Sequence, residues 1–141
     1  MAYSGIHAAH PAVSSACRRA LCGLTSLEGG AKAAPGVDAF LLRLYRPILF
    51  SALSAPNPAI RRNAGESLFA CFPLQDPAHC AAEADALLAQ QAAAFTALLS
   101  DDAPAVRCSA VAGVASCLDA YWELVTPAAA AGFARHIADE L

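Results

Sequence analysis

The sequence predicts an all-α protein built from pairs of helices that repeat along the chain, and three observations lead to this prediction. Alanine, the strongest helix former, provides 37 of the 141 residues. Aromatic residues make up only 7% of the chain and runs of β-branched residues are scarce, which argues against a sheet protein. Segments with apolar side chains at three- and four-residue spacing follow capping residues, and part of this pattern recurs at a fixed offset.

The chain is expected to divide into an N-terminal part, residues 1–36, and a repeated part, residues 37–141. The first part should hold a loop or short turn, a helix near Ala12–Leu27 and a linker marked by Gly29, Gly30, Pro35 and Gly36. The second part is divided into residues 37–73, residues 78–122 and the start of a further unit at residue 127.

Capping signatures mark four helix starts in the repeated part. Asp38 is the candidate N-cap of a helix over Ala39–Leu53, within which Pro47 should cause a kink. Three dipeptides combine a capping side chain with proline at the first helical position, where its missing N–H had no partner. They are Asn57-Pro58, Asp76-Pro77 and Thr126-Pro127. A helix over roughly Ala81–Ser100 carries Gln91 on its apolar face, and this amide should lie near an edge or hydrogen-bond to the backbone.

The chain matches itself at an offset of 46 residues. Seven of the 20 positions in residues 53–72 are identical in residues 99–118, including Pro58 with Pro104 and Arg61 with Arg107. A period of about 40–47 residues built from two helices is typical of HEAT and armadillo repeats. The predicted fold is therefore a HEAT/armadillo-type α-α superhelix with about two and a half repeats, and we expect it to be a fragment of a longer solenoid or a truncated gene product.

Arg61 and Arg107 follow an aliphatic residue, Ile60 or Val106, near the start of the second helix of each repeat. The aliphatic side chain should fill the space between the paired helices. The arginine can then reach a carboxylate in the turn of its own or the neighbouring repeat, such as Asp101 or Asp102. We interpret Arg61 and Arg107 as structural arginines of the repeats.

Two segments carry a family resemblance. Gly36-Val37-Asp38 followed by Leu-Leu-Arg-Leu-Tyr-Arg-Pro-Ile-Leu-Phe at residues 41–50, and Phe-Pro-Leu-Gln-Asp-Pro at residues 72–77, resemble the G-type HEAT subunit of condensin II. The chain differs from that family in its length and in having Phe50 where tryptophan is common. The resemblance implies a non-catalytic scaffold subunit in the nucleus, which acts in mitotic and meiotic chromosome condensation. Its implied partners are the kleisin subunit, the SMC ATPase pair that kleisin bridges, and DNA.

Arg43, Arg46 and Arg62 form the candidate partner- or DNA-binding surface. Residues 1–80 hold seven Lys/Arg and four Asp/Glu, whereas residues 81–141 hold two and eight. Arg43 and Arg46 share a helical face, and Arg62 should project to solvent. Together they could bind a phosphate backbone or an acidic kleisin peptide. The alternative is a solvated polar face.

Sequence patterns of enzymes and membrane proteins are missing. The chain has no phosphate-binding glycine loop, nucleophile elbow or HExxH motif. His79-Cys80 fits a polar turn, and His7, His10, Cys17 and Cys22 lack the CxxC spacing typical of zinc sites. The longest charge-free helical stretch, Ala86–Ser100, is shorter than the ~18 apolar residues of a membrane span. We expect no catalytic residue, metal, cofactor, small-molecule substrate or membrane association.

Two other functions remain open at this point. One is a generic HEAT-repeat adaptor that binds another protein partner. The other is an enzyme-linked HEAT module with a metal or hydroxylation site, which would require bound metal.

Overall fold

The computed structural model describes residues 2–25 and 37–139, and all regular secondary structure within these ranges is helical. This confirms the predicted all-α class. None of the described helices combines the length and apolar character that crossing a bilayer requires. In chain order the helices are α1 (Ala2–Ile6), α2 (Pro11–Thr25), α3 (Val37–Ala52), α4 (Pro58–Cys71), α5 (Ala81–Leu99), α6 (Pro104–Tyr121), the short 3-10 helix η2 (Trp122–Leu124) and α7 (Pro127–Asp139).

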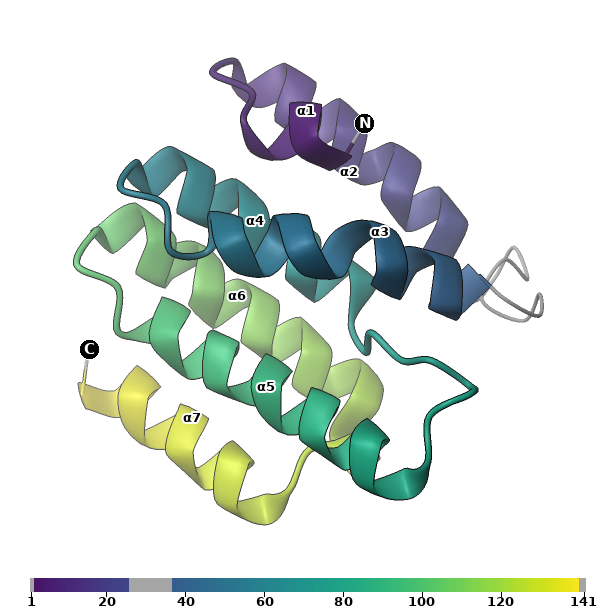
Figure 1. Ribbon diagram of the computed structural model, residues 1–141. Coiled ribbons are helices and arrows are strands. Elements are labelled where there is room, and N and C mark those ends of the chain that lie inside the picture. The colour runs from purple at the N-terminus through teal and green to yellow at the C-terminus, as the bar shows by residue number, and fades with distance from the viewer. Residues whose placement is uncertain (1, 26–36, 140–141) are drawn as a thin grey trace.

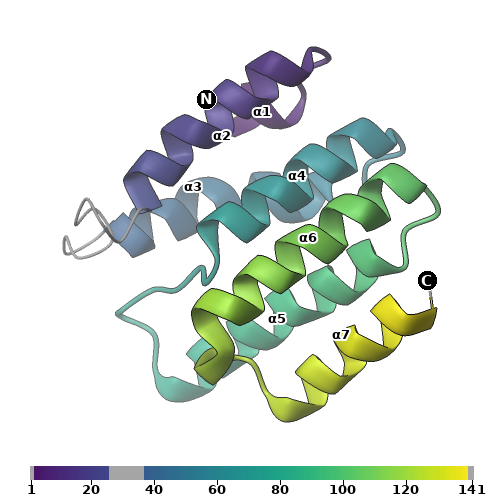
Figure 2. The same cartoon turned by 180° about the vertical axis from the view of Figure 1, so that it is seen from behind.

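The helices form two layers. Figure 1 shows α3, α5 and α7 side by side in the layer nearer the viewer. Figure 2, seen from behind, shows α2, α4 and α6 as the other layer, now in front. Consecutive helices pair between the layers, so α3 packs on α4 and α5 packs on α6. The contact between α4 and α6 is the most extensive in the described structure.

Two of the predicted helix caps are present. Asn57 precedes Pro58, and its side-chain oxygen accepts a hydrogen bond from the Ala59 backbone N–H at 2.9 Å. Thr126 precedes Pro127 in the same way, and its Oγ1 accepts from the Ala129 N–H at 3.3 Å. Each oxygen satisfies a backbone donor that has no partner inside its helix.

Two other predicted caps were wrong. α3 begins at Val37, so Asp38 is its second residue and not its N-cap. The Asp76 side chain accepts from the Ala78 N–H at 2.9 Å, but this closes a turn and starts no helix. α5 begins only at Ala81, after Cys80, whose N–H donates to the Glu83 carboxylate at 2.9 Å. An aspartate that accepts from the N–H two residues later stabilises turns as well as helix starts. The Asp-Pro pattern in the sequence therefore cannot distinguish a turn from the start of a helix.

Other elements lie close to their predicted positions. α5 matches the predicted helix over residues 81–100 within one residue. α2 begins at Pro11 and is described to Thr25, while residues 26–36 of the expected helix end and linker lie outside the described residues. α3 continues through Pro47. The N-terminal short turn is a one-turn helix, α1.

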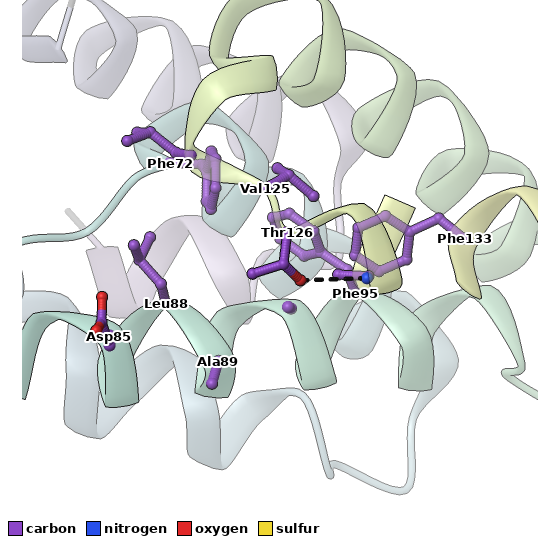
Figure 3. A pocket seen from close by; sticks show the side chains of 11 residues that line it. Phe72, Asp85, Leu88, Ala89, Phe95, Val125, Thr126 and Phe133 are labelled. Atoms are coloured by element: carbon purple, nitrogen blue, oxygen red, sulfur yellow. Dashed lines mark hydrogen bonds between the residues drawn. The ribbon is translucent and has the colours of Figure 1, made fainter. Parts of the chain in front are cut away.

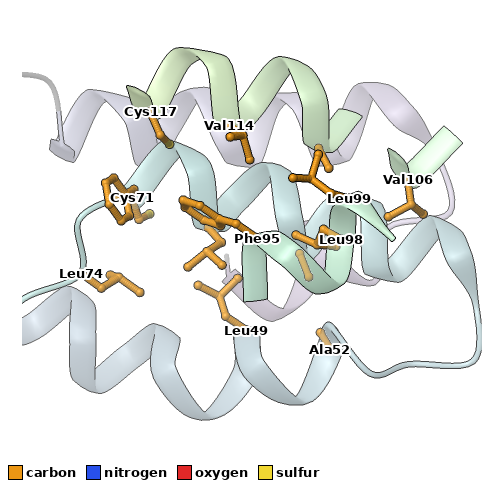
Figure 4. Close-up of a cluster of buried hydrophobic side chains, with 14 of the residues drawn as sticks. Leu49, Ala52, Cys71, Leu74, Phe95, Leu98, Leu99, Val106, Val114 and Cys117 are labelled. Carbon is orange, nitrogen blue, oxygen red and sulfur yellow. The ribbon is translucent and has the colours of Figure 1, made fainter. Parts of the chain in front are cut away.

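Equivalent positions of the two repeats share the core (Figure 4). Leu53 and Leu99, Ala64 and Ala110, Leu68 and Val114, and Cys71 and Cys117 are each separated by 46 residues, and all except the half-buried Leu53 are buried. The Phe95 ring of α5 lies among these residues, with its centroid 4.9 Å from that of Phe69, 5.2 Å from that of Phe72 and 6.0 Å from that of Phe133. Phe95 therefore links the α3–α4 pair to α7.

The segment between α4 and α5 is held by Gln91, whose side chain is completely buried. The Leu74 N–H donates to Gln91 Oε1 at 2.8 Å, and Gln91 Nε2 donates to the carbonyls of Leu74 at 3.0 Å and Leu87 at 3.2 Å. This confirms the second of the two predicted settings for Gln91, a hydrogen bond to the backbone. The amide replaces the backbone partners that Leu74 lacks outside a helix.

Candidate functional site

Arg61 joins the two repeats through a fork of hydrogen bonds. Its Nε donates to Asp101 Oδ2 at 2.6 Å and its Nη2 donates to Asp101 Oδ1 at 2.8 Å. Both side chains are largely covered, with 17% of the Arg61 and 9% of the Asp101 side chain exposed. A planar guanidinium and a carboxylate match in this two-bond geometry, so the pair sets the position of the second repeat's turn relative to α4.

Arg61 and Arg107 also bind the backbone of the turn before their own helix. Arg61 Nη1 donates to the carbonyls of Ala55 at 2.8 Å and Pro56 at 3.0 Å. Arg107 Nη1 donates to the carbonyls of Asp101 at 2.8 Å and Asp102 at 3.2 Å. Donors and acceptors are both displaced by 46 residues between the two sets, so the sequence repeat is also a repeat of hydrogen-bond geometry.

The ion pair shifts the acid–base behaviour of both partners. The hydrogen bond from Arg61 lowers the pKa of Asp101, partly opposed by burial, and a hydrogen bond from the Ala103 N–H lowers it further. The hydrogen bond to Asp101 raises the pKa of Arg61. Both groups therefore stay charged at neutral pH.

Arg62 belongs to a polar cluster between α2, α4 and α6. Its Nε lies 3.9 Å from Glu66 Oε1, one helical turn further along α4, and about a third of the side chain is exposed. Glu66 also forms an ion pair with Arg18 of α2 and accepts from Ser109 Oγ of α6 at 3.1 Å. Arg62 thus lies near a carboxylate that also interacts with side chains of α2 and α6.

Arg43 and Arg46 lie on α3, in the other layer, and both are exposed. Neither has an ion-pair partner within the ranges that the structure covers. The three predicted surface arginines therefore lie on two helices in different local settings. Arg43 and Arg46 share one helix, whereas Arg62 contacts Glu66. Their role in binding stays a prediction.

A groove between α3 and α5, on the same helix as Arg43 and Arg46 but not lined by them, was not expected from the sequence. It has a volume of about 250 Å³, and α5 contributes Gln90, Ala94, Ala97 and Leu98. The end of α3 contributes Phe50, Leu53 and Ser54, and Asp101 closes the groove. The signal that could have revealed it is Phe50, an aromatic residue one helical turn after Arg46.

A larger cavity of about 480 Å³ lies between α5, η2 and α7 (Figure 3). Its walls are mainly apolar, with Phe72, Leu88, Phe95 and Phe133 around it and Asp85 among the lining residues. No cluster of three potential metal ligands occurs in the described ranges, where His79 and Cys80 lie in and beside the turn before α5. Among the described side chains, the Ser100 hydroxyl after α5 lies 3.2 Å from Nδ1 of His136 on α7, at an exposed position.

Comparison with known proteins places the chain near one protein family. The family described as "Condensin II non structural maintenance of chromosomes subunit" matches residues 1–76. Condensin-2 complex subunit G2 from Mus musculus is 34% identical over 110 residues, which cover 78% of this chain and 10% of that protein. The Danio rerio protein of the same name is 42% identical over 93 residues, which cover 66% of this chain and 8% of that protein.

The human protein of that name is likewise 34% identical over 110 residues. The chain therefore spans about a tenth of the length of the relatives it matches. No solved structure shows significant similarity to it.

Proposed function

Because the chain belongs to the family of condensin II subunits that are not structural maintenance of chromosomes (SMC) proteins, we propose that it is a segment of a non-catalytic scaffold subunit. In this role it acts on chromosomes in the nucleus, in mitotic and meiotic chromosome condensation. The observation that carries the proposal is the family match over residues 1–76, which includes α3 and α4.

The fold proposed for this scaffold is a HEAT-repeat solenoid. Its support is the hydrogen-bond pattern of Arg61 and Arg107, which repeats with a displacement of 46 residues together with the stacked helix pairs. Each helix pair covers only one side of its neighbour, so repeats of this kind stack into an extended surface suited to binding macromolecules.

The proposed partners are the kleisin subunit and the SMC ATPase pair of condensin II, with DNA as a further ligand. Arg43 and Arg46 support a contact with an anionic partner because they are exposed and lack ion-pair partners among the described residues. Arg62 remains the third candidate of this surface, although its ion pair with Glu66 reduces the charge it can offer.

A co-purification experiment tests the function. The full-length subunit that contains this segment is tagged and purified with the condensin II kleisin and the SMC pair. Recovery of kleisin and SMC proteins in stoichiometric amounts is the expected result. A folded subunit that recovers neither would contradict the condensin assignment and leave a generic HEAT-repeat adaptor with another protein partner.

The arginine surface is tested separately in the same complex. The triple substitution Arg43→Glu, Arg46→Glu and Arg62→Glu should weaken DNA or kleisin binding, with Arg135→Glu on α7 as the control for a change of charge at an exposed arginine. Unchanged binding of both ligands would remove these three residues from the binding surface and leave the scaffold role intact.

A further inference from the structure

We propose that the groove between α3 and α5 binds a short peptide segment in which apolar residues are followed by acidic ones. The inference rests on the proposed scaffold function and specifies the chemistry of one partner. It assigns Arg43 and Arg46 to the acidic part of the peptide and the groove to its apolar part.

The groove suits one or two apolar side chains. Its walls are formed by Phe50 and Leu53 of α3 and by Ala94, Ala97 and Leu98 of α5. Its volume of about 250 Å³ is below the roughly 300–1,000 Å³ of sites for drug-sized molecules. The alanine side chains of α5 project only a short distance toward α3, which leaves room for a partner's side chain between the two helices.

Helix geometry places the arginines at one end of this groove. Arg46 precedes Phe50 by four residues and Arg43 precedes Arg46 by three, so the three side chains follow one another along the same side of α3. Phe50 lines the groove, and Arg46 and Arg43 therefore extend the groove wall toward the beginning of α3.

Arg43 and Arg46 do not line the groove, but as exposed residues of α3 they place positive charge on the part of that helix that precedes it. Asp101 lines the groove, but its two carboxylate oxygens accept hydrogen bonds from Arg61. Gln90, on the α5 wall, is exposed and uncharged. A bound segment with carboxylates beside Arg43 and Arg46 and apolar side chains beside Phe50 would thus meet complementary chemistry along its length.

The same features favour a peptide over DNA. A phosphate backbone is bound by several cations spread along its length, and its binding does not need an apolar groove. Two arginines beside an apolar depression, with Arg62 bound to Glu66, resemble a peptide site more closely.

Fluorescence anisotropy on the full chain tests the proposal. The probe is a fluorescein-labelled dodecapeptide with two adjacent leucines followed by four glutamates. We expect saturable binding, weakened about tenfold or more by Arg43→Glu/Arg46→Glu and by replacing the two leucines with serines. Gln90→Lys should tighten binding and Gln90→Glu should weaken it. Arg19→Glu/Arg135→Glu, which changes the same net charge at two exposed arginines elsewhere, should leave it unchanged.

Three outcomes would overturn the proposal. The first is the absence of saturable peptide binding by a chain that circular dichroism shows to be helical. The second is equal affinity for the leucine and serine peptides. The third is binding of a 20-base-pair DNA duplex that depends on Arg43 and Arg46 and that the peptide does not compete for. Because co-purification of the full-length subunit does not depend on this probe, failure of the groove leaves the proposed scaffold function to its own test.

Discussion

At the scale of single residues, the polar side chains of Arg61 and Gln91 set the positions of backbone segments that lie outside the helices. Arg61 binds the turn before its own helix and the carboxylate of the next turn. Gln91 binds both backbone groups of Leu74. In each case one side chain satisfies several groups, and the loss of Gln91 would leave buried backbone partners unpaired.

Asp101→Asn should lower the free energy of unfolding by about 1–2 kcal/mol at pH 7. Asparagine can still accept from the Ala103 N–H, but it cannot offer two anionic oxygens to Arg61. The pKa of Asp101 is lower in the folded state than in the unfolded state. The contribution of its charge to the stability of the fold is therefore fully present above the unfolded-state pKa, and it is lost as the pH falls through the folded-state pKa.

Urea denaturation across pH measures this effect. The difference between wild type and Asp101→Asn should be constant from about pH 5 upward and shrink below about pH 4. Asp102→Asn, at the exposed neighbouring residue, serves as the control and should change little. A difference that stays the same down to pH 2 would mean that the carboxylate charge does not contribute.

Gln91→Leu should lower the free energy of unfolding by about 1–3 kcal/mol, although leucine is close to glutamine in size. The Leu74 N–H and carbonyl would lose their hydrogen-bond partner in a fully buried position. Chemical denaturation compares this variant with Gln90→Leu, which changes an exposed glutamine. Equal stability of the two variants would show that the buried amide is dispensable.

At the scale of helices, α4 and α6 approach closely because Gly113 has no side chain. A Cβ added there would lie 2.1 Å from Cδ2 of Phe69, whose ring packs on Phe95. Gly132 on α7 has nothing within 4 Å of the same position. Gly113 and Gly132 therefore have opposite constraints, since the first is constrained by packing and the second only by helix propensity.

Gly113→Ala should destabilise the protein by about 1–3 kcal/mol, since the Phe69 ring must move out of its packed position. Gly132→Ala should instead stabilise it by roughly 0.5–1 kcal/mol through helix propensity. Thermal denaturation followed by circular dichroism compares the two melting temperatures. An increase for both variants would show that the contact between α4 and α6 is loose.

At the scale of the whole molecule, Glu66 connects the N-terminal helices to the repeated part. Its carboxylate pairs with Arg18 of α2, lies near Arg62 of α4 and accepts from Ser109 of α6. α2 also packs directly on α4. The N-terminal pair is thus joined to the first two repeats by this carboxylate, by the buried Asn63 amide of α4, which donates to the Ile6 carbonyl at 3.1 Å, and by helix packing.

Glu66→Ala should loosen α2 selectively. Hydrogen–deuterium exchange followed by mass spectrometry is expected to show faster exchange in α2, with α5 and α7 unchanged. Among the described residues, the hydrogen bonds and ion pairs of the Glu66 side chain go to α2, α4 and α6. Asp119→Ala, at an exposed position of α6, is the control. Uniformly faster exchange would mean that the described helices open as one unit.

Much of the fold could be predicted from the sequence because its signals are local. Proline after a capping residue predicted where α4 and α7 begin, and apolar spacing predicted both ends of α5 within one residue. The offset of 46 residues predicted which positions would be equivalent, and it led to the expectation that Arg61 reaches a carboxylate such as Asp101. Asp76 misled the prediction because its side chain stabilises a turn by the same hydrogen bond that caps a helix.

The candidate site was less predictable. Arg43, Arg46 and Arg62 look alike in the sequence, yet only Arg62 lies near a carboxylate that α2 and α6 also use. The groove between α3 and α5 exists because α5 presents Ala94 and Ala97 to the end of α3, more than 40 residues earlier in the chain. The positions of the helices follow from residues that are near one another in the sequence, and the repeat length follows from comparing the sequence with itself. Which arginines lie near a carboxylate, and where a groove stays open, depend on how segments distant in the sequence pack together. Local periodicity does not encode that packing.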